Sequence, residues 1–227
     1  MTTTLITGAT KGLGRETARR LVELGHTVYL GARDLERGER VAAELGATAV
    51  LLDVTDDASV EAAASRVDHL DVLVNNAGIS GGFTPVGETT AADLLRVYDT
   101  NVFGVVRVTH AFLPLLEQST APVVVNVSSG MGSLGVTTDP NRFESTLIGL
   151  AYSSSKTAVN MLTTQYAKAY PRMRINAVDP GYTSTDLNGH RGTQSVEEGT
   201  DAIVRMATIG PDGPTGAFVD RHGPVAW

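Results

Sequence analysis

The sequence predicts an α/β protein with a doubly wound, mostly parallel sheet of about seven strands and helices on both faces. Short β-branched runs alternate with longer helical runs, and a glycine follows each of the first two helical runs. The run Pro122–Val127 is almost wholly apolar, as is typical of a strand buried on both faces. This alternation indicates βαβ units, and because no linker separates them we expect one domain over residues 1–227.

The first half of the chain contains predicted strands that each precede a helix. The strands are expected over Thr3–Thr7, Thr27–Gly31, Thr48–Leu52 and Asp71–Val74, and the helices over Leu13–Leu24, Leu35–Leu45, Asp56–Val67 and Thr90–Gln118. Gly25 and Gly46 stand where helix C-caps are expected, and Asp56 is expected to cap the third helix. The last of these helices contains the polar residue Asn101, near which we expect a break.

The second half is expected to add further strands and two long helices. The strands are Pro122–Val127, Arg174–Val178 and Gly216–Val219, and the helices are Ala151–Tyr170 and Ser195–Ile209. The helix Ala151–Tyr170 and the run Leu94–Leu116 are apolar on most faces. Helices of this kind are buried on more than one side, so we expect a homodimer or homotetramer that forms through them.

The composition excludes several classes of protein. The chain has 227 residues, 42% of them hydrophobic, and a net charge of −7. A negative charge repels nucleic acids and anionic membrane surfaces, so we expect neither as a partner. There is no cysteine, which excludes disulfides and thiolate chemistry. The first residues do not resemble a secretory signal and no run is long and apolar enough to span a bilayer, so we expect a cytoplasmic protein.

A glycine-rich segment, Thr7-Gly8-Ala9-Thr10-Lys11-Gly12-Leu13-Gly14, joins the first strand to the first helix. Glycines let the backbone turn tightly and approach a pyrophosphate, and the N-terminus of the helix offers free N–H groups. The spacing is Gly-x-x-x-Gly-x-Gly rather than the Gly-x-Gly-x-x-Gly dinucleotide fingerprint. The segment therefore indicates a phosphate site, with a tight turn that binds no ligand as the alternative.

Tyr152 and Lys156 stand at positions i and i+4, which puts them on one face of a helix. An ammonium group beside a phenol favours the phenolate, so we expect Lys156 to lower the pKa of Tyr152 towards the working pH. A tyrosine of this kind suits general acid catalysis of carbonyl reduction. The alternative is an ordinary solvated pair on a helix surface.

Other polar residues stand where a ligand or a buried hydrogen bond is expected. Ser128 and Ser129 end the apolar strand, and ligands bind outside the carboxyl ends of parallel strands. A serine there can donate a hydrogen bond to a substrate oxygen, and a simple turn or helix cap is the alternative. Asn101 lies in an apolar helical run, where the residue alone favours a buried amide with satisfied hydrogen bonds.

Together these residues resemble the short-chain dehydrogenases/reductases over nearly the whole chain. The resemblance rests on Thr7-Gly8-x-x-x-Gly12-x-Gly14, Asp53-Val54, Asn75-Asn76-Ala77-Gly78, Asn101, Ser129, Tyr152-x-x-x-Lys156 and Pro180-Gly181. Within the family the chain is most similar to NADPH-dependent carbonyl reductases, judging by Gly31-Ala32-Arg33-Asp34 and Gly216-Ala217-Phe218-Val219. The resemblance implies a Rossmann-type fold and a nicotinamide cofactor, and we expect no metal site.

The resemblance also implies catalytic roles. Tyr152 would protonate the carbonyl oxygen, and Lys156 would lower the pKa of Tyr152 and bind the nicotinamide ribose. Ser129 would orient the carbonyl and stabilise negative charge on its oxygen. Ser129 is chosen over Ser128 because the family's catalytic serine is usually the second of such a pair. Asn101 would support a water relay to Lys156.

The cofactor contacts that the resemblance implies come from every part of the pattern. They are Gly8, Thr10, Lys11, Gly12, Leu13, Gly14, Arg33, Asp53, Val54, Asn75, Ala77, Gly78, Tyr152, Lys156, Pro180, Gly181, Thr183 and Thr185. Asp53 would meet the adenine, and Asn75 and Gly78 would lie on the adenine ribose side. Thr183 and Thr185 would bind the carboxamide.

The choice between NADP(H) and NAD(H) depends on the end of the second strand. NAD(H) binding usually places an acidic residue there, but by counting the position falls on Ala32. Arg33 follows, and its guanidinium suits a 2′-phosphate, with Lys11 as a second positive charge. We therefore expect NADP(H). Asp34 is the rival residue that would favour NAD(H), and a plain surface charge is the alternative for Arg33.

One departure from the family is a longer gap between Ser129 and Tyr152 than compact members have. The extra residues, near Thr137–Gly149, are expected to form a flap over the site or to alter assembly. Apolar residues near the catalytic positions suggest a pocket for ketones or aldehydes, although such residues more often belong to a core. They are Met131, Leu134 and Tyr182.

The sequence thus predicts an NADP(H)-dependent oxidoreductase that transfers a hydride between the nicotinamide and the carbonyl or alcohol carbon of a small, apolar aldehyde or ketone. The alternative is a non-catalytic regulator that senses NADP(H) on the same fold, because fold does not fix function. The presence of Asn101, Ser129, Tyr152 and Lys156 together favours the enzyme. Epimerase or dehydratase chemistry on nucleotide sugars is disfavoured by the short chain after Pro180.

Overall fold

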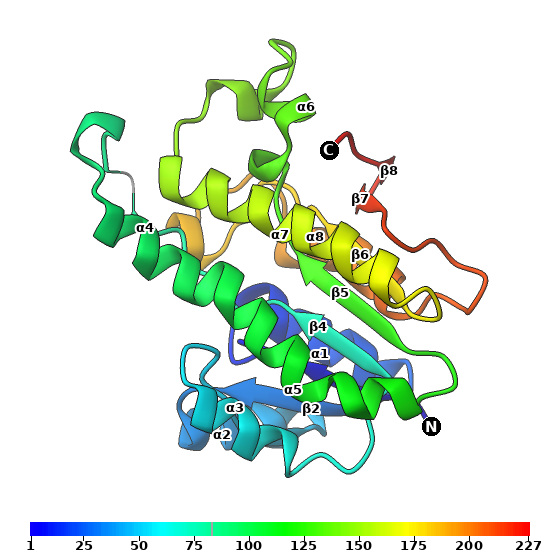
Figure 1. Cartoon of the computed structure of the whole chain (residues 1–227). Coiled ribbons are helices and arrows are strands. Elements are labelled where there is room, and N and C mark those ends of the chain that lie inside the picture. The colour runs from blue at the N-terminus through cyan, green and yellow to red at the C-terminus, as the bar shows by residue number, and fades with distance from the viewer. Residues whose placement is uncertain (83) are drawn as a thin grey trace.

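The strands form one sheet in the order β3-β2-β1-β4-β5-β6-β7-β8 (Figure 1). In the computed structural model, which describes residues 1–82 and 84–227, their bounds are β1 (Thr3–Ile6), β2 (Thr27–Ala32), β3 (Thr48–Leu51), β4 (Val72–Asn75), β5 (Val123–Val127), β6 (Arg174–Val178), β7 (Phe218–Asp220) and β8 (Gly223–Pro224). All neighbouring pairs are parallel except β7 and β8. The predicted doubly wound parallel sheet is confirmed, with a short eighth strand beyond the seven predicted.

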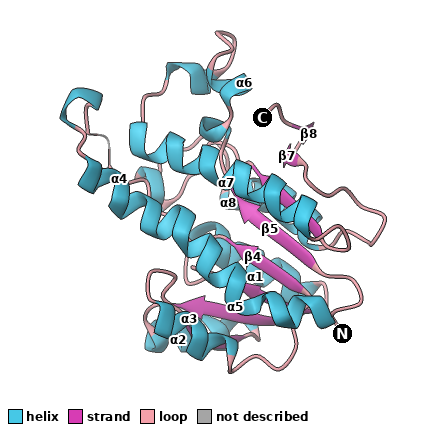
Figure 2. Cartoon of the chain, in the orientation of Figure 1, coloured by secondary structure: helices cyan, strands magenta, loops and turns pink. Residues whose placement is uncertain are grey.

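Helices cover both faces of this sheet (Figure 2). They are α1 (Gly12–Glu23), α2 (Leu35–Leu45), α3 (Asp57–Ala64), α4 (Ala91–Tyr98), α5 (Gly104–Gln118), α6 (Leu134–Thr137), α7 (Leu150–Ala169) and α8 (Val196–Ala207). α1, α2 and α8 contribute to one hydrophobic cluster, and α3, α5 and α7 to the cluster on the other face. Among the helices of the described residues, none is long and apolar enough to cross a membrane.

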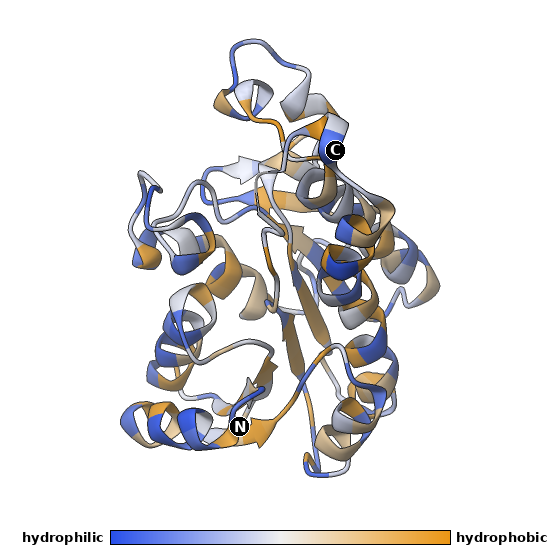
Figure 3. Ribbon diagram, turned by 90° about the vertical axis from the view of Figure 1, so that its left-hand side faces the viewer, coloured by the Kyte–Doolittle hydropathy of each residue, from blue (hydrophilic) through white to orange (hydrophobic). Residues whose placement is uncertain are grey.

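The core forms on both sides because successive strand residues point to opposite faces. In β1, Leu5 belongs to the cluster that contains Phe112 of α5, and Ile6 to the cluster that contains Leu21 of α1. Every residue of β4 and β5 is buried, which explains their nearly continuous apolar sequence. Figure 3 shows the hydrophobic strands at the centre, with hydrophilic residues on the outward sides of the helices.

Local signals in the sequence fix several helix ends. The Asp34 side chain caps α2 by accepting a hydrogen bond from the Arg37 N–H, and Gly46 ends the same helix in a left-handed conformation. Asp56 caps α3 as predicted, although α3 is shorter than the predicted helix. A side-chain cap of this kind is worth about 1 kcal/mol. These caps explain why α2 has the bounds that the sequence predicts.

The predicted break in the long helix is a π-helical turn, Asp99–Phe103, between α4 and α5. Asn101 lies in this turn and is 1% exposed. Arg107, one turn further along, braces it, because its Nη1 lies 2.8 Å from Asp99 Oδ1 and its Nε lies 2.8 Å from Asp57 Oδ1 on α3. Such turns are frequent at functional sites.

The strand order defines where a ligand is expected to bind. β1 pairs with β2 on one side and with β4 on the other, so the chain changes direction across the sheet at this point. In open α/β sheets, ligands bind outside the carboxyl ends of the strands at such a switch point. The glycine-rich segment follows β1, and Asn75-Asn76-Ala77-Gly78 ends β4 and continues past it.

The extra residues before Tyr152 lie beside the C-terminal end of the chain (Figure 1). We call residues 133–149, which comprise α6 and the extra residues near Thr137–Gly149, the inserted segment; it also contains a short 3-10 turn over Phe143–Thr146. The Ser133 hydroxyl donates to the Ala226 carbonyl at 2.7 Å, and the Gly135 N–H donates to the Trp227 carbonyl at 2.9 Å. The segment is therefore held in place by residues from the end of the chain.

Candidate active site

The glycine-rich segment is shaped by its glycines. Gly8 and Gly12 have φ angles of +63° and +53°, in the left-handed region that favours glycine. A Cβ on Gly14 would lie 2.5 Å from the Asn76 Nδ2 atom and 2.7 Å from the Gly8 oxygen. The backbone can therefore approach the chain after β4 this closely only with glycine at position 14. The segment leads directly into the N-terminus of α1, as a phosphate site requires.

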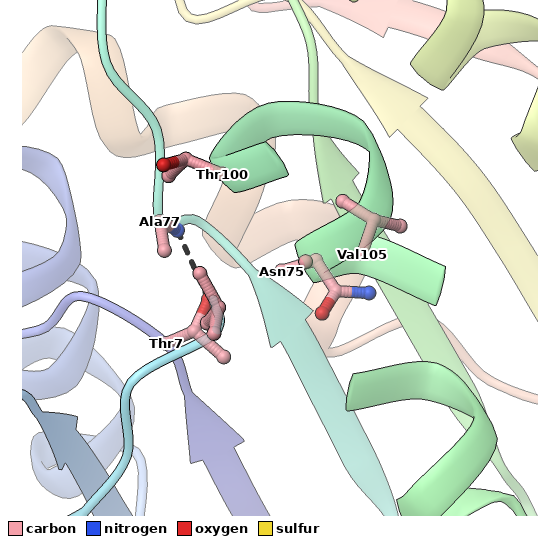
Figure 4. A pocket seen from close by; sticks show the side chains of 7 residues that line it. Thr7, Asn75, Ala77, Thr100 and Val105 are labelled. Carbon is pink, nitrogen blue, oxygen red and sulfur yellow. Dashed lines mark hydrogen bonds between the residues drawn. The ribbon is translucent and has the colours of Figure 1, made fainter. Parts of the chain in front are cut away.

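Asn76 and Thr7 tie this segment to the chain that follows β4. The Asn76 Nδ2 donates to the Thr7 carbonyl at 2.8 Å, and the Thr7 hydroxyl accepts from the Ala77 N–H at 2.9 Å. Figure 4 shows this contact between Thr7 and Ala77 in a small pocket at the switch point. Asn76 belongs to the Asn-Asn-Ala-Gly motif, but only the folded chain shows which backbone its side chain reaches.

The Asn75 side chain points away from the glycine-rich segment (Figure 4). It is 4% exposed and donates to the Asn126 Oδ1 at 2.9 Å and to the Thr109 hydroxyl at 3.1 Å. The Asn75 amide nitrogen is therefore occupied within the core, whereas its Oδ1 has no hydrogen-bond partner among the described residues. Gly78, which the same motif contains, lies near both Asn101 and Lys156, since its Cβ position is 3.4 Å from Asn101 Oδ1 and 3.6 Å from Lys156 Nζ.

Tyr152 and Lys156 lie on α7, facing the end of β5. The Lys156 Nζ is 5.7 Å from the centroid of the Tyr152 ring and donates to the Val127 carbonyl at 2.8 Å. The Ser129 hydroxyl lies within hydrogen-bonding reach of the Tyr152 phenol. Gly132 lets the turn after Ser129 lie directly on α7, because a Cβ there would be 2.6 Å from the Lys156 backbone. The structure thus brings these three predicted residues together.

The protonation of this pair differs from the sequence prediction. Burial raises the pKa of Tyr152 to about 12, and the hydrogen bond from Ser129 only partly opposes this. Burial also lowers the pKa of Lys156 to about 8. The predicted lowering of the Tyr152 pKa by Lys156 is therefore wrong. The alternative, a solvated helical pair, is wrong as well, because Lys156 is 5% exposed.

Asn101 joins the loop after β4 to α7. Its Oδ1 accepts from the Ile79 N–H at 2.8 Å, and its Nδ2 donates to the Ile79 carbonyl at 2.9 Å and to the Ser155 hydroxyl at 3.0 Å. The expectation of a satisfied buried amide is confirmed. The same hydrogen bonds hold the loop after β4 beside Lys156. Asn101 therefore stabilises the fold and also lies within the candidate site.

The charged residues that bear on the choice between NADP(H) and NAD(H) lie on different loops. Arg33 is exposed directly after β2, while Ala32 before it is buried. The Asp34 carboxylate is occupied as the cap of α2. Lys11 forms an ion pair with Asp186, with 2.6 Å between Nζ and Oδ2, so its charge is shared with the loop after β6.

The other predicted cofactor contacts lie around the same edge of the sheet. Asp53 follows β3 and accepts hydrogen bonds from the N–H and hydroxyl of Thr55, while Val54 is buried against Gly104. After β6, Gly181 has a φ of +72°. Thr183 is buried, and its hydroxyl donates a hydrogen bond to the Pro180 carbonyl. Thr185 touches the glycine-rich segment, because its methyl carbon lies 3.6 Å from the Cβ position of Gly12.

The inserted segment lies against the turn that carries Ser129. The rings of Phe143 and Tyr182 have centroids 5.5 Å apart, and the Met131 methyl carbon lies 3.3 Å from the Cβ position of Gly149. The segment thus adds apolar side chains next to the candidate catalytic residues. No cluster of three or more metal-ligating side chains occurs in the part of the chain that the structure describes.

The sequence pattern of the short chain dehydrogenase family matches residues 2–195. The chain belongs to this family of oxidoreductases, whose fold binds a nicotinamide cofactor.

Relatives and solved structures agree with this assignment. The chain is 38% identical to the short-chain dehydrogenase anuI of Penicillium roqueforti, with 97% of this chain and 94% of that protein covered. It is 32% identical to (−)-isopiperitenone reductase of Mentha piperita, with 98% and 97% covered. The crystal structure of NADPH-bound carbonyl reductase from chicken fatty liver is similar, with a TM-score of 0.86, 26% identity, and 99% and 98% of the two chains covered.

Proposed function

We propose that this protein is a single-domain, NADP(H)-dependent carbonyl reductase that interconverts small, apolar aldehydes or ketones and their alcohols. The observation that carries the proposal is the convergence of Ser129, Tyr152 and Lys156 at the carboxyl end of β5, with Asn101 behind them. Hydroxyl groups from two different elements meet there, beside a buried amine, next to a glycine cradle for a dinucleotide.

The proton chemistry follows from the pKa values. Because burial raises the pKa of Tyr152 to about 12, the phenol holds its proton at neutral pH and can give it to a carbonyl oxygen. The Ser129 hydroxyl is placed to donate a hydrogen bond to the same oxygen. The pKa of Lys156 is lowered to about 8, which supports a role for this amine in restoring the proton of Tyr152. In this proposal Lys156 also binds the ribose hydroxyls.

The cradle around the glycine-rich segment fits a dinucleotide. The segment lies close to Ala77 at Gly8 and to Asn76 at Gly14, and it leads directly into the N-terminus of α1, where free N–H groups suit a pyrophosphate. When bound, the reduced nicotinamide supplies the hydride for the carbonyl carbon. We propose as contacts Gly8, Thr10, Lys11, Gly12, Leu13, Gly14, Arg33, Asp53, Val54, Ala77, Gly78, Tyr152, Lys156, Pro180, Gly181, Thr183, Thr185 and the backbone of Asn75.

Two observations favour NADP(H) over NAD(H). Arg33 is exposed beside the switch point, in the place where a 2′-phosphate needs a guanidinium. The rival residue, Asp34, already accepts the Arg37 N–H as a helix cap, and turning it to a ribose would break that cap. The similar carbonyl reductase from chicken fatty liver, which binds NADPH in its crystal structure, agrees with these two observations.

Exposed apolar side chains support the proposed homodimer or homotetramer. Leu95 on α4, Phe103 in the π-helical turn and Met161 on α7 are 63%, 44% and 60% exposed. Sedimentation that shows only a monomer at micromolar concentration would contradict this assembly.

The experiment that tests the function measures NADPH oxidation against a panel of aldehydes, ketones, quinones and steroids. We expect turnover with at least one apolar ketone, and a loss of about a hundredfold or more in kcat for Tyr152→Phe because the proton donor is removed. NADPH binding, measured by fluorescence, should remain nearly unchanged in this variant. A wild-type chain that binds NADPH but turns over none of the panel would favour the sensing regulator instead.

A further inference from the structure

A buried carboxyl group that the proposed reaction does not use lies beside the candidate catalytic residues. Asp179 follows β6 and is 5% exposed. Its Oδ1 accepts from the Gly181 N–H at 2.9 Å, and the Gly130 N–H donates to the same carboxylate. Asp179 therefore connects the turn that carries Ser129 with the turn at Pro180 and Gly181.

A second carboxylate, from the inserted segment, reaches the same point. A Cβ on Gly130 would lie 2.9 Å from Asp179 Oδ2 and 3.0 Å from Glu144 Oε1. Both carboxylates thus lie close to the position of a Cβ on Gly130, the residue directly after Ser129. A larger residue there would require at least one of the two carboxylates to move.

Charged groups on three elements face Asp179. Glu144 and Arg142 come from the inserted segment, where they form an ion pair of 3.4 Å, and Asp220 comes from β7. The charge of Asp179 also acts on Tyr152 and Lys156 of α7, whose pKa values it raises. Burial and the like charges of Glu144 and Asp220 raise the pKa of Asp179, while its two backbone N–H bonds oppose this.

Building on the proposed reductase function, we propose that Asp179 is a positioning residue. Its carboxyl group holds the Ser129–Gly130 turn against the Pro180–Gly181 turn, and its negative charge adds to the effect of burial in keeping Tyr152 protonated. Glu144 places the inserted segment next to this carboxyl group, so the segment adds a charge to the site as well as apolar surface.

The sign of the effect follows from simple electrostatics. A carboxylate near a phenol disfavours the phenolate, so ionised Asp179 raises the pKa of Tyr152. The same charge favours the ammonium form of Lys156 and raises its pKa against the effect of burial. Removing the charge therefore lowers both pKa values. At the alkaline pH where phenols ionise, even a buried carboxyl group is a carboxylate.

The test compares Asp179→Asn with the wild-type chain. The amide keeps an oxygen for the Gly181 N–H but has no charge. The pH at which Tyr152 ionises is read from the ultraviolet difference spectrum of phenolate, with Tyr152→Phe identifying the contribution of this tyrosine. We expect Tyr152 to ionise at a pH lower by about half a unit to one unit. The alkaline limb of kcat/KM, which follows the loss of the Lys156 proton, should move to lower pH as well, because the same charge raises the pKa of Lys156.

A matched control and a second variant complete the test. Glu36→Gln removes one carboxylate from α2 that is 84% exposed, and it should leave the titration unchanged. Asp179→Ser keeps a hydroxyl oxygen without charge and should shift Tyr152 in the same direction as Asp179→Asn. Titration of Tyr152 at the wild-type pH in either folded variant would overturn the proposal, as would failure of both variants to fold, since Asp179 would then be only structural.

The spectroscopic measurement needs no substrate, which separates this proposal from the proposed function. If Tyr152 shifts but no carbonyl compound is reduced, the reductase function fails and the electrostatic role of Asp179 stands. If carbonyls are reduced and Tyr152→Phe abolishes turnover, but the titration does not move, only the role of Asp179 fails.

Discussion

Lys11 and Asp186 form an ion pair that joins the glycine-rich segment to the loop after β6, across 175 positions of sequence. The distance from Nζ to Oδ2 is 2.6 Å, and His190 Nε2 lies 2.8 Å from the other carboxylate oxygen. Both side chains of the ion pair are about half exposed. The pair therefore holds the two loops together while leaving both charges within reach of water and of an incoming anion.

Removing Asp186 should strengthen NADPH binding. In the Asp186→Asn variant the Lys11 ammonium loses its anionic partner and becomes available to the 2′-phosphate. We expect the KM for NADPH to fall about twofold to fivefold, a modest change because exposed ion pairs are weak, and the KM for NADH to stay constant. Steady-state kinetics with both cofactors measure this. Equal changes for the two cofactors would mean that Lys11 does not read the phosphate.

Arg33→Ala should weaken NADPH binding selectively. The guanidinium is exposed after β2 and forms no ion pair among the described residues, so it is available to a phosphate. We expect the KM for NADPH to rise about tenfold, as for the loss of one charge-assisted contact, with little change for NADH. Arg37→Ala, on the next helix, is the control. A similar loss in both variants would show a general effect of surface charge.

Reduction should slow as the pH rises above about 8. Because burial lowers the pKa of Lys156 to about 8, the ammonium loses its proton in this range, while Tyr152, with a pKa of about 12, remains protonated. We expect kcat/KM to be constant at neutral pH and to decline through this transition. Profiles recorded from about pH 6 to about pH 10 cover it. A flat profile would show that the charge of Lys156 is not needed.

Gly14→Ala should damage both folding and cofactor binding. Its Cβ would lie 2.5 Å from Asn76 Nδ2 and 2.7 Å from the Gly8 oxygen, so the glycine-rich segment must move. We expect a loss of about 1–3 kcal/mol in the free energy of unfolding, as for other overpacked sites, and weaker NADPH binding. Thermal denaturation and fluorescence titration measure the two effects.

Gly87→Ala is the matched control for Gly14→Ala. Nothing lies within 4 Å of the Cβ position of Gly87, and its φ is not in the left-handed region. This variant should be as stable as the wild-type chain or slightly more stable, because alanine restricts the unfolded chain. A loss at position 87 as large as that at position 14 would refute the steric explanation.

The sequence predicted those parts of the molecule that depend on local chemistry. The bounds of α2 follow from the Asp34 cap and from Gly46. The bounds of β6 follow from the run Arg174–Val178, in which all residues after Arg174 are buried. The glycine-rich segment and Ser129 were found because they follow predicted strands, and Tyr152 and Lys156 because of their helical spacing. The other site residues came from the resemblance to the family. The two-residue strand β8 has no pattern of its own and depends on the edge of β7.

The charge states of the site were not predictable in the same way. The spacing of Tyr152 and Lys156 shows that they are neighbours, but the direction of the pKa shift depends on burial by elements far away in the sequence. The ion-pair partner of Lys11, Asp186, is likewise evident only from the structure, because it lies on the loop after β6, far away in the sequence. Asp179 carried a readable signal, since it is a charged residue directly after an apolar strand and before Pro180.

The amide pair between β4 and β5 has a consequence for how the catalytic helix is aligned. Asn75 and Asn126 are partners in the strand register, and Asn126 Nδ2 donates to the Thr163 hydroxyl on α7 at 2.9 Å. A slip of either strand by one residue would leave buried amides without hydrogen-bond partners, which is costly. Apolar residues at the same positions would not oppose such a slip in this way. These hydrogen bonds therefore fix the position of α7 along the sheet, and with it the distance by which Tyr152 and Lys156 extend past the end of the sheet. Replacing Asn75, Asn126 and Thr163 together by apolar residues would therefore test whether a more stable core can hold Tyr152 and Lys156 in less accurate positions.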